Sequence, residues 1–135
     1  MERKFREHGE ASIAAEDGLI VIRSRGPWNI EHVHAGDAVI CNLVREFGGK
    51  PWQVLGVLHG DGLHTPDAFE AQTEAIRQHH ALGRRGTALV LADVGGSAFF
   101  RSVFSRMYRA AGEAFEFFPD EQSARQWLAE RSTHL

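Results

Sequence analysis

The hydrophobic positions along the chain change their spacing several times, and each change marks a predicted element. Residues 11–25 form two extended runs that meet at Asp17-Gly18, a pair typical of a tight hairpin turn. The second run, Leu19-Ile20-Val21-Ile22, is continuously apolar and predicts a strand buried on both faces. The milder Ser12-Ile13-Ala14-Ala15 predicts an edge strand. The sheet is therefore expected to begin with a β-hairpin.

Four later segments have the features of helices. The first lies between a capping residue, Asn29, and a break at Gly48-Gly49, and its apolar positions are Ile30, Val33, Ile40, Val44 and Phe47. Thr65-Pro66-Asp67 combines a capping hydroxyl, a proline that needs no N–H partner and a carboxylate at the positive end of a helix, and it predicts a second helix up to Leu82. A third helix is expected after Gly95-Gly96-Ser97 and a fourth after Pro119-Asp120.

Three further strands are predicted between these helices, at residues 52–58, 87–92 and 114–118. The run at 87–92 is the most strand-like of the chain and is expected at the centre of the sheet. Strands that alternate with helices need crossover connections, so most of the sheet is predicted to be parallel. We therefore predict a single layered α/β domain over residues 11–131, with about five strands and four helices, after a charged segment at residues 1–10.

Composition narrows the class of protein without naming a function. With 135 residues, 43% hydrophobic and 24% charged, the chain fits one globular domain that buries its own core. The formal charge of −3 gives no bulk attraction to nucleic acid or to an anionic membrane. No apolar run is long enough to span a bilayer, and charges interrupt the first twelve residues, so neither a transmembrane helix nor a secretory signal is expected. A single cysteine, Cys41, fits a reducing compartment, and the expected location is the cytoplasm.

Two segments carry a family resemblance. Gly26-Pro27-Trp28-Asn29 leads into the first helix, and residues 117–128 read FFPDEQSARQWL. With the element order, these segments resemble the SpoIIAA-like group of bacterial proteins, which is related to the STAS domain (sulfate transporter and anti-sigma-factor antagonist). Members of that group resemble one another in a closing strand, an acidic helix start and an Ala-x-x-Trp-Leu signature. The resemblance covers about residues 11–130 and implies a layered fold, shared in outline with lipid-carrying CRAL-TRIO domains. It does not imply an enzyme.

One departure from that pattern affects function. Classical anti-sigma-factor antagonists carry Asp-Ser-Ser-Gly or Asp-Ser-Thr-Gly at a strand-to-helix junction, where one hydroxyl is phosphorylated. The two comparable junctions of this chain read HGDGLHT, at residues 59–65, and DVGGS, at residues 93–97. Neither matches, so a phosphorylation switch at Thr65 or Ser97 stays open but loses most of its support from the resemblance.

The same two junctions form the first candidate binding site. Ligands of parallel sheets usually bind beyond the carboxyl ends of the strands, near a point where the strand order reverses. Glycines before a helix could also present backbone N–H groups to an anion. The residues expected at this edge are His59, Asp61, His64, Thr65, Asp93, Gly95, Gly96 and Ser97. The structural alternative, which we favour, is that the glycines form turns, Thr65 and Ser97 cap helices and the histidines are solvated.

Metal and nucleophile chemistry find only partial support in the residue spacing. No two of the eight histidines have the i, i+4 spacing of a helical metal site, although His59, Asp61 and His64 could hold an ion from a loop. His34, Asp37 and Cys41 fall on about one face of the first helix, where the thiol could be nucleophilic or could serve as a small hydrophobic residue in the core. We favour the core, and expect neither a metal nor a cofactor.

The third helix has more apolar residues than one contact face needs. They could line a ligand pocket, form a dimer surface or pack on both sides of the helix; they are Phe99, Phe100, Phe104, Met107 and Tyr108. Arg101, Arg106 and Arg109 on this helix, with Arg84 and Arg85 upstream, form a locally basic part of the chain. It could meet an acidic partner surface or be a solvated helix face, and no nucleic-acid partner is expected.

The sequence leaves three functions open. The first is a non-enzymatic regulatory or protein-interaction module that resembles STAS domains and binds a protein partner or a second copy of itself. The second is a carrier of a small apolar or anionic molecule, resembling CRAL-TRIO domains, with its ligand near the third helix and the Gly95-Gly96 turn. The third is an enzyme that uses His59, Asp61 and His64. It comes last because these residues form no complete acid–base or nucleophile set.

Overall fold

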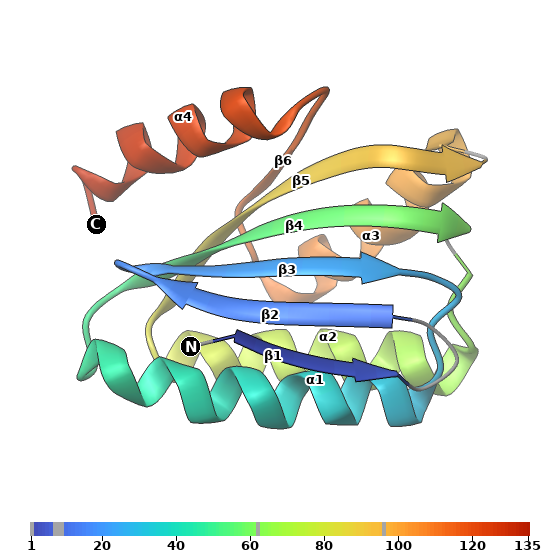
Figure 1. The fold of residues 1–135 in the computed structure, drawn as a ribbon, viewed down its shortest axis with the longest axis horizontal. Helices are drawn as coiled ribbons and strands as arrows, with labels where there is room; N and C mark the ends of the chain where they lie inside the picture. The colour runs from blue at the N-terminus through green and yellow to red at the C-terminus, as the bar shows by residue number, and fades with distance from the viewer. Residues whose placement is uncertain (1, 7–9, 62, 96) are drawn as a thin grey trace.

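The protein is built on one six-stranded sheet (Figure 1). Its computed structural model describes residues 2–6, 10–61, 63–95 and 97–135, with side chains described over 11–60, 63–91 and 98–135. The strands lie in the order of the sequence: β1 (Glu2–Arg6), β2 (Glu10–Glu16), β3 (Leu19–Arg25), β4 (Trp52–Asp61), β5 (Arg84–Gly95) and β6 (Phe115–Phe118). Strands β1 to β3 pair antiparallel and β3 to β6 pair parallel. The predicted α/β class, the opening hairpin and the largely parallel sheet are confirmed.

Strand β1 is a difference from the prediction. The sequence indicated only a charged segment there, and placed the edge of the sheet at Ser12-Ile13-Ala14-Ala15. That edge was wrong, because Glu2–Arg6 pairs with β2 and places β2 between two neighbours. A charged sequence is compatible with this position, since edge strands commonly carry charges that discourage further pairing. The run at 87–92 was predicted at the centre of the sheet, and this position was also wrong. It belongs to β5, which has neighbours on both sides but is next to the edge strand β6.

The four helices begin where the sequence predicted. They are α1 (Ile30–Leu43), continued by the short 3₁₀ helix η1 (Val44–Phe47), α2 (Pro66–Ala81), α3 (Ser97–Ala111) and α4 (Glu121–Ser132). The side chain of Asn29 accepts a hydrogen bond from the backbone N–H of His32 at 2.9 Å, and that of Asp120 accepts one from Ser123 at 2.7 Å. These caps satisfy backbone donors that have no partner inside the helix, which is why the helices begin there.

The helices divide between the two faces of the sheet. Val54 and Leu58 of β4 pack into the clusters that α1, α2 and α3 cover, whereas Leu55 and Val57 pack beneath α4. Both sets are buried, which explains why the strand is apolar without alternation. On α4, the residues of the predicted signature have a packing role: Ala124 and Leu128 are buried against the sheet, and the Trp127 ring lies beside that of Phe118.

The strand order contains no reversal along the described sheet. Each crossover through α1, α2 or α3 carries the chain to the next strand on the same side of the previous one (Figure 1). The described sheet therefore has no reversal point near the predicted site, because such a crevice needs two neighbouring crossovers that diverge. The site at the carboxyl ends of β4 and β5 stays a prediction. Helices α1, α2 and α3 instead lie side by side over one face of the sheet. Among the described residues, no helix is long and apolar enough to cross a membrane.

Candidate functional site

A cavity of about 90 Å³ lies between the sheet and helices α1, α2 and α3. Small residues on three elements leave this space: Gly36 on α1, Gly56 on β4 and Ala75 on α2. A Cβ atom on Gly56 would come within 2.8 Å of Leu89 Cδ2, so a larger residue there would have to displace the end of the Leu89 side chain. Most of the wall is apolar or aromatic, and the space exceeds what one buried water needs, about 10–15 Å³.

Aromatic rings line the cavity at the carboxyl ends of β3 and β4. The Trp28 indole donates a hydrogen bond from Nε1 to Ser24 Oγ at 2.7 Å, and its ring lies edge-on to Phe104 with centroids 6.0 Å apart. The His64 ring lies 5.1 Å from that of Trp28 and 5.3 Å from that of Phe104. The backbone N–H of Trp28 also donates to the Leu63 carbonyl at 2.9 Å, which ties the two loops together at this end.

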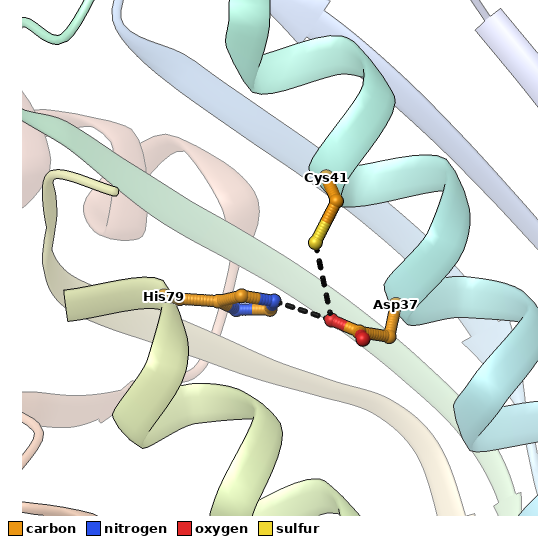
Figure 2. A group of neighbouring side chains, drawn as sticks. All are labelled: Asp37, Cys41 and His79. Atoms are coloured by element: carbon orange, nitrogen blue, oxygen red, sulfur yellow. Dashed lines mark hydrogen bonds and ion pairs between the residues drawn. The ribbon is translucent and has the colours of Figure 1, made fainter. Parts of the chain in front are cut away.

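A chain of polar groups, half-buried at Asp37 and buried from His79 onward, forms the opposite wall. Asp37 Oδ1 on α1 lies 2.6 Å from His79 Nε2 on α2, and it also accepts a hydrogen bond from the thiol of Cys41 at 3.6 Å (Figure 2). On the other side of the imidazole, Nδ1 of His79 lies 3.1 Å from a terminal nitrogen of Arg84 at the start of β5. Arg84 is only 3% exposed, so the guanidinium is held inside the protein, and its placement in a solvated basic group was wrong.

These contacts determine the protonation of His79. A guanidinium only donates hydrogen bonds, so Nδ1 must accept the one from Arg84 and carry no proton. The proton of the neutral ring then resides on Nε2, from which it is donated to Asp37. Burial lowers the pKa of His79, and the hydrogen bond from His79 holds the pKa of Asp37 below its usual range. The pair is thus a neutral imidazole and a carboxylate.

Glu113 neutralises Arg84. This residue follows α3, is 5% exposed, and accepts hydrogen bonds from Arg84 Nε at 2.5 Å, Thr87 Oγ1 at 2.6 Å and His80 Nε2 at 2.8 Å. Burial alone would raise the pKa of Glu113, but the charge of Arg84 and the three hydrogen bonds outweigh it, and the pKa is lowered. The second terminal nitrogen of Arg84 donates to Thr87 at 2.8 Å, so all three guanidinium nitrogens have partners.

The network does not suit a metal ion, although Asp37, Cys41 and His79 each place a ligand atom within 4.8 Å of the others. A histidine that binds a metal through one nitrogen normally donates the other N–H to a carboxylate, a carbonyl or a water. Coordination through Nε2 would move the ring proton to Nδ1, where it would point at the N–H of Arg84. Arg84 cannot accept it, so this group is better explained as a set of hydrogen bonds.

The same contacts argue against covalent catalysis by Cys41. Burial, followed by the charge of Asp37, raises the pKa of the thiol, so it remains protonated at neutral pH. Asp37 and Cys41 do lie on one face, as their spacing predicted, but the third predicted member, His34, is exposed and His79 occupies its place. Both nitrogens of His79 are already engaged, which leaves no base for a substrate.

Of the residues predicted at the carboxyl edge and described with their side chains, only His64 lines the cavity. His59 is half-buried, and its backbone carbonyl accepts a hydrogen bond from Gly26. Thr65 caps α2, accepting from the backbone N–H of Ala68 and donating to Asp67. Gly95 ends β5. Gly96 and the side chains of Asp61, Asp93 and Ser97 lie outside the described residues, and so does the predicted anion site at Gly95-Gly96.

The apolar residues of α3 separate into three groups. Phe104 and Tyr108 line the cavity. Phe100 and Met107 are fully buried in the core between α3 and the sheet, where no partner could reach them. Phe99 is 56% exposed and is the only one of the five that is open to solvent.

Comparison with known proteins finds no family model, no curated protein and no solved structure that matches this chain.

Acidification is expected to destabilise the protein from about pH 6.5 downward. The pKa of His79 in the folded state lies below its ordinary value of 6.5, so between those values the unfolded chain binds a proton that the folded protein does not. Stability then falls with decreasing pH by up to about 1.4 kcal/mol per pH unit. The lowered pKa values of Asp37 and Glu113 add further losses in the carboxylate range, as pH falls through their folded-state values. Urea unfolding of the protein over a pH series measures this slope.

A pair of variants assigns the slope to His79. His79→Gln removes the titrating ring, whereas His134→Gln changes an exposed histidine near the carboxyl terminus. The first is expected to flatten the pH dependence near 6.5, and the second to leave it unchanged. An equal slope in the wild-type protein and in His79→Gln contradicts the assignment.

Proposed function

We propose that this protein is a non-enzymatic binding module that takes up a small, mostly apolar molecule between its sheet and helices α1, α2 and α3. The observation that carries the proposal is the cavity of about 90 Å³, which small residues keep open and aromatic rings surround. A concave, mostly apolar space with a few polar groups at one wall is the usual form of a small-molecule site. The resemblance to CRAL-TRIO domains, which carry lipids in a related fold, supports the same function.

The polar network supports binding more than catalysis. Its donors and acceptors are engaged with one another, so the network stiffens one wall without offering an acid, a base or a nucleophile. We also propose that the protein works in a reducing compartment such as the cytoplasm, which the single Cys41 supports.

Filling the cavity is expected to abolish binding. Ala75 is 7% exposed and lines the cavity from α2, so Ala75→Phe would occupy the space that a ligand needs. Ala81→Phe is the matched control, because Ala81 lies on the same helix and is exposed. The measurement is titration with toluene and phenol followed by heteronuclear NMR of the backbone amides. Saturable shifts around the cavity are expected in the wild-type protein and in Ala81→Phe, and none in Ala75→Phe. If neither compound gives saturable shifts in the wild-type protein, the proposed function is wrong.

A protein-interaction module is the second candidate, favoured by one observation. Phe99 at the start of α3 is 56% exposed, whereas the other large apolar residues of this helix are buried. An exposed phenylalanine is typical of a contact residue at an interface, and the resemblance to STAS domains supports a partner or a homodimer. Analytical ultracentrifugation over a range of concentrations distinguishes a homodimer from a module that binds another protein. A dimer indicates self-association, and a monomer indicates another partner or none.

A further inference from the structure

Tyr108 brings a single unsatisfied hydroxyl group to the cavity. It is the only tyrosine of the chain, is 4% exposed and lines the cavity from α3. Its ring is fixed between those of Phe104 and Phe115, with centroids 5.8 Å and 5.3 Å away. Among the described residues, no group exchanges a hydrogen bond with its hydroxyl, whose oxygen is not fully buried and borders the cavity.

A buried phenol without a partner is unusual. Buried tyrosine hydroxyls normally find one, since removing such a group from water without a replacement hydrogen bond is costly. Burial also raises the pKa of Tyr108, so the hydroxyl stays protonated and able to donate. The nearby network does not supply the partner: the hydrogen bonds of Arg84 and Glu113 join them to each other, to His79, to His80 and to Thr87. The hydroxyl is therefore available to a molecule that occupies the cavity.

The charges of the polar wall indicate which contents it favours. Arg84 and Glu113 cancel, and His79 is neutral between Arg84 and Asp37. Asp37 then leaves one net negative charge at this wall, with no uncompensated cation among the described groups of the network. The two other histidines of the cavity, His32 and His64, lie at the Trp28 end. The charged groups that act on the Tyr108 hydroxyl are Arg84 and Glu113, which cancel each other. An anionic group placed beside Tyr108 would therefore lose its water without a net attraction in return, whereas a neutral hydroxyl or carbonyl loses less.

We propose that Tyr108 anchors an uncharged hydrogen-bonding molecule of the phenol or small-alcohol class, with its apolar body against the aromatic wall of the cavity. This inference rests on the proposed function and refines it, since it favours neutral over anionic ligands. The Tyr108 hydroxyl and the hydroxyl of the ligand share one hydrogen bond, and the rings of Trp28 and Phe104 contact the apolar part.

The test compares three probes of similar shape on the full chain. Phenol carries a hydroxyl, toluene has a methyl group at the same position, and benzoate carries a negative charge. Tyr108→Phe removes one oxygen and keeps the ring, so the packing on Phe104 and Phe115 is preserved, and urea unfolding confirms that the variant is folded. We expect Tyr108→Phe to weaken phenol binding by about three- to tenfold, the worth of one neutral hydrogen bond, and to leave toluene binding unchanged. In the wild-type protein, benzoate is expected to bind more weakly than phenol.

A single tyrosine also gives a direct signal. Protein labelled with carbon-13 in the tyrosine ring has one resonance for the carbon that bears the hydroxyl, and phenol is expected to shift it while toluene leaves it nearly in place. An equal effect of Tyr108→Phe on phenol and toluene would show a packing role and overturn the anchor. Benzoate binding tighter than phenol would overturn the preference for a neutral ligand. If none of the three probes binds the wild-type protein, the proposed function fails and this inference fails with it.

Discussion

Replacing Glu113 by glutamine is expected to lower the free energy of unfolding by about 3–5 kcal/mol, because it leaves the buried Arg84 without its counter-charge. Arg84 is 3% exposed and Glu113 5%, so water cannot replace the lost partner. Glutamine also exchanges an acceptor oxygen for an NH₂ group, which would face donors on Arg84, Thr87 or His80. We therefore expect the loss of one partner to cost much more stability than the replacement of both partners by apolar residues.

Urea unfolding at neutral pH, followed by tryptophan fluorescence, measures this loss. Glu116→Gln is the matched control, since Glu116 lies in β6 on an exposed position, and its change is expected to stay within about 0.5 kcal/mol. The double variant Arg84→Met with Glu113→Leu removes both charges and is expected to recover a large part of the stability. A loss below about 1 kcal/mol in Glu113→Gln would show that water reaches the pair.

The sequence predicted the elements well because their signals are local. The caps at Asn29, Thr65 and Asp120, the break at Gly48 and the apolar strand runs each depend on a few neighbouring residues. The exception was β1, whose charged residues carry no apolar pattern and whose pairing comes from the open edge of β2. The direction in which successive strands add to the sheet also depends on how whole crossovers pack, so the absence of a reversal was not predictable from any one segment.

The site was less predictable because its members come together from distant parts of the chain. Asp37 and Cys41 were recognisable as one helix face, but their partner His79 lies 42 residues after Asp37, on another helix. Glu113 lies in the connection after α3, where a charged residue is expected to be exposed to solvent. Only its contact with Arg84, 29 residues earlier, accounts for its burial. The cavity itself depends on the small residues Gly36, Gly56 and Ala75, which share no sequence pattern. They leave space only because α1, β4 and α2 face one another in the fold.

Two adjacent phenylalanines on α3 provide the second large expected effect. Phe100→Ala is expected to lower the free energy of unfolding by about 3–5 kcal/mol, and Phe99→Ala to change it by less than about 1 kcal/mol. Phe100 is fully buried, stacked on Phe104 with centroids 4.6 Å apart and set edge-on to Trp28 at 5.7 Å, whereas Phe99 is 56% exposed. The residue type and the helix are the same, so the difference measures burial alone.

The same pair also links the core to the cavity. Phe100 holds Phe104 and Trp28, which form the aromatic wall, so its removal frees both rings to move into the space that a ligand needs. Under conditions in which Phe100→Ala is still folded, it is expected to bind toluene more weakly than the wild-type protein does, while Phe99→Ala binds it equally well. Urea unfolding and the toluene titration measure the two effects on the same samples. If both variants lost stability equally, the orientation of α3 against the sheet would be different from the one described, and Phe104 and Tyr108 would no longer belong to the cavity wall.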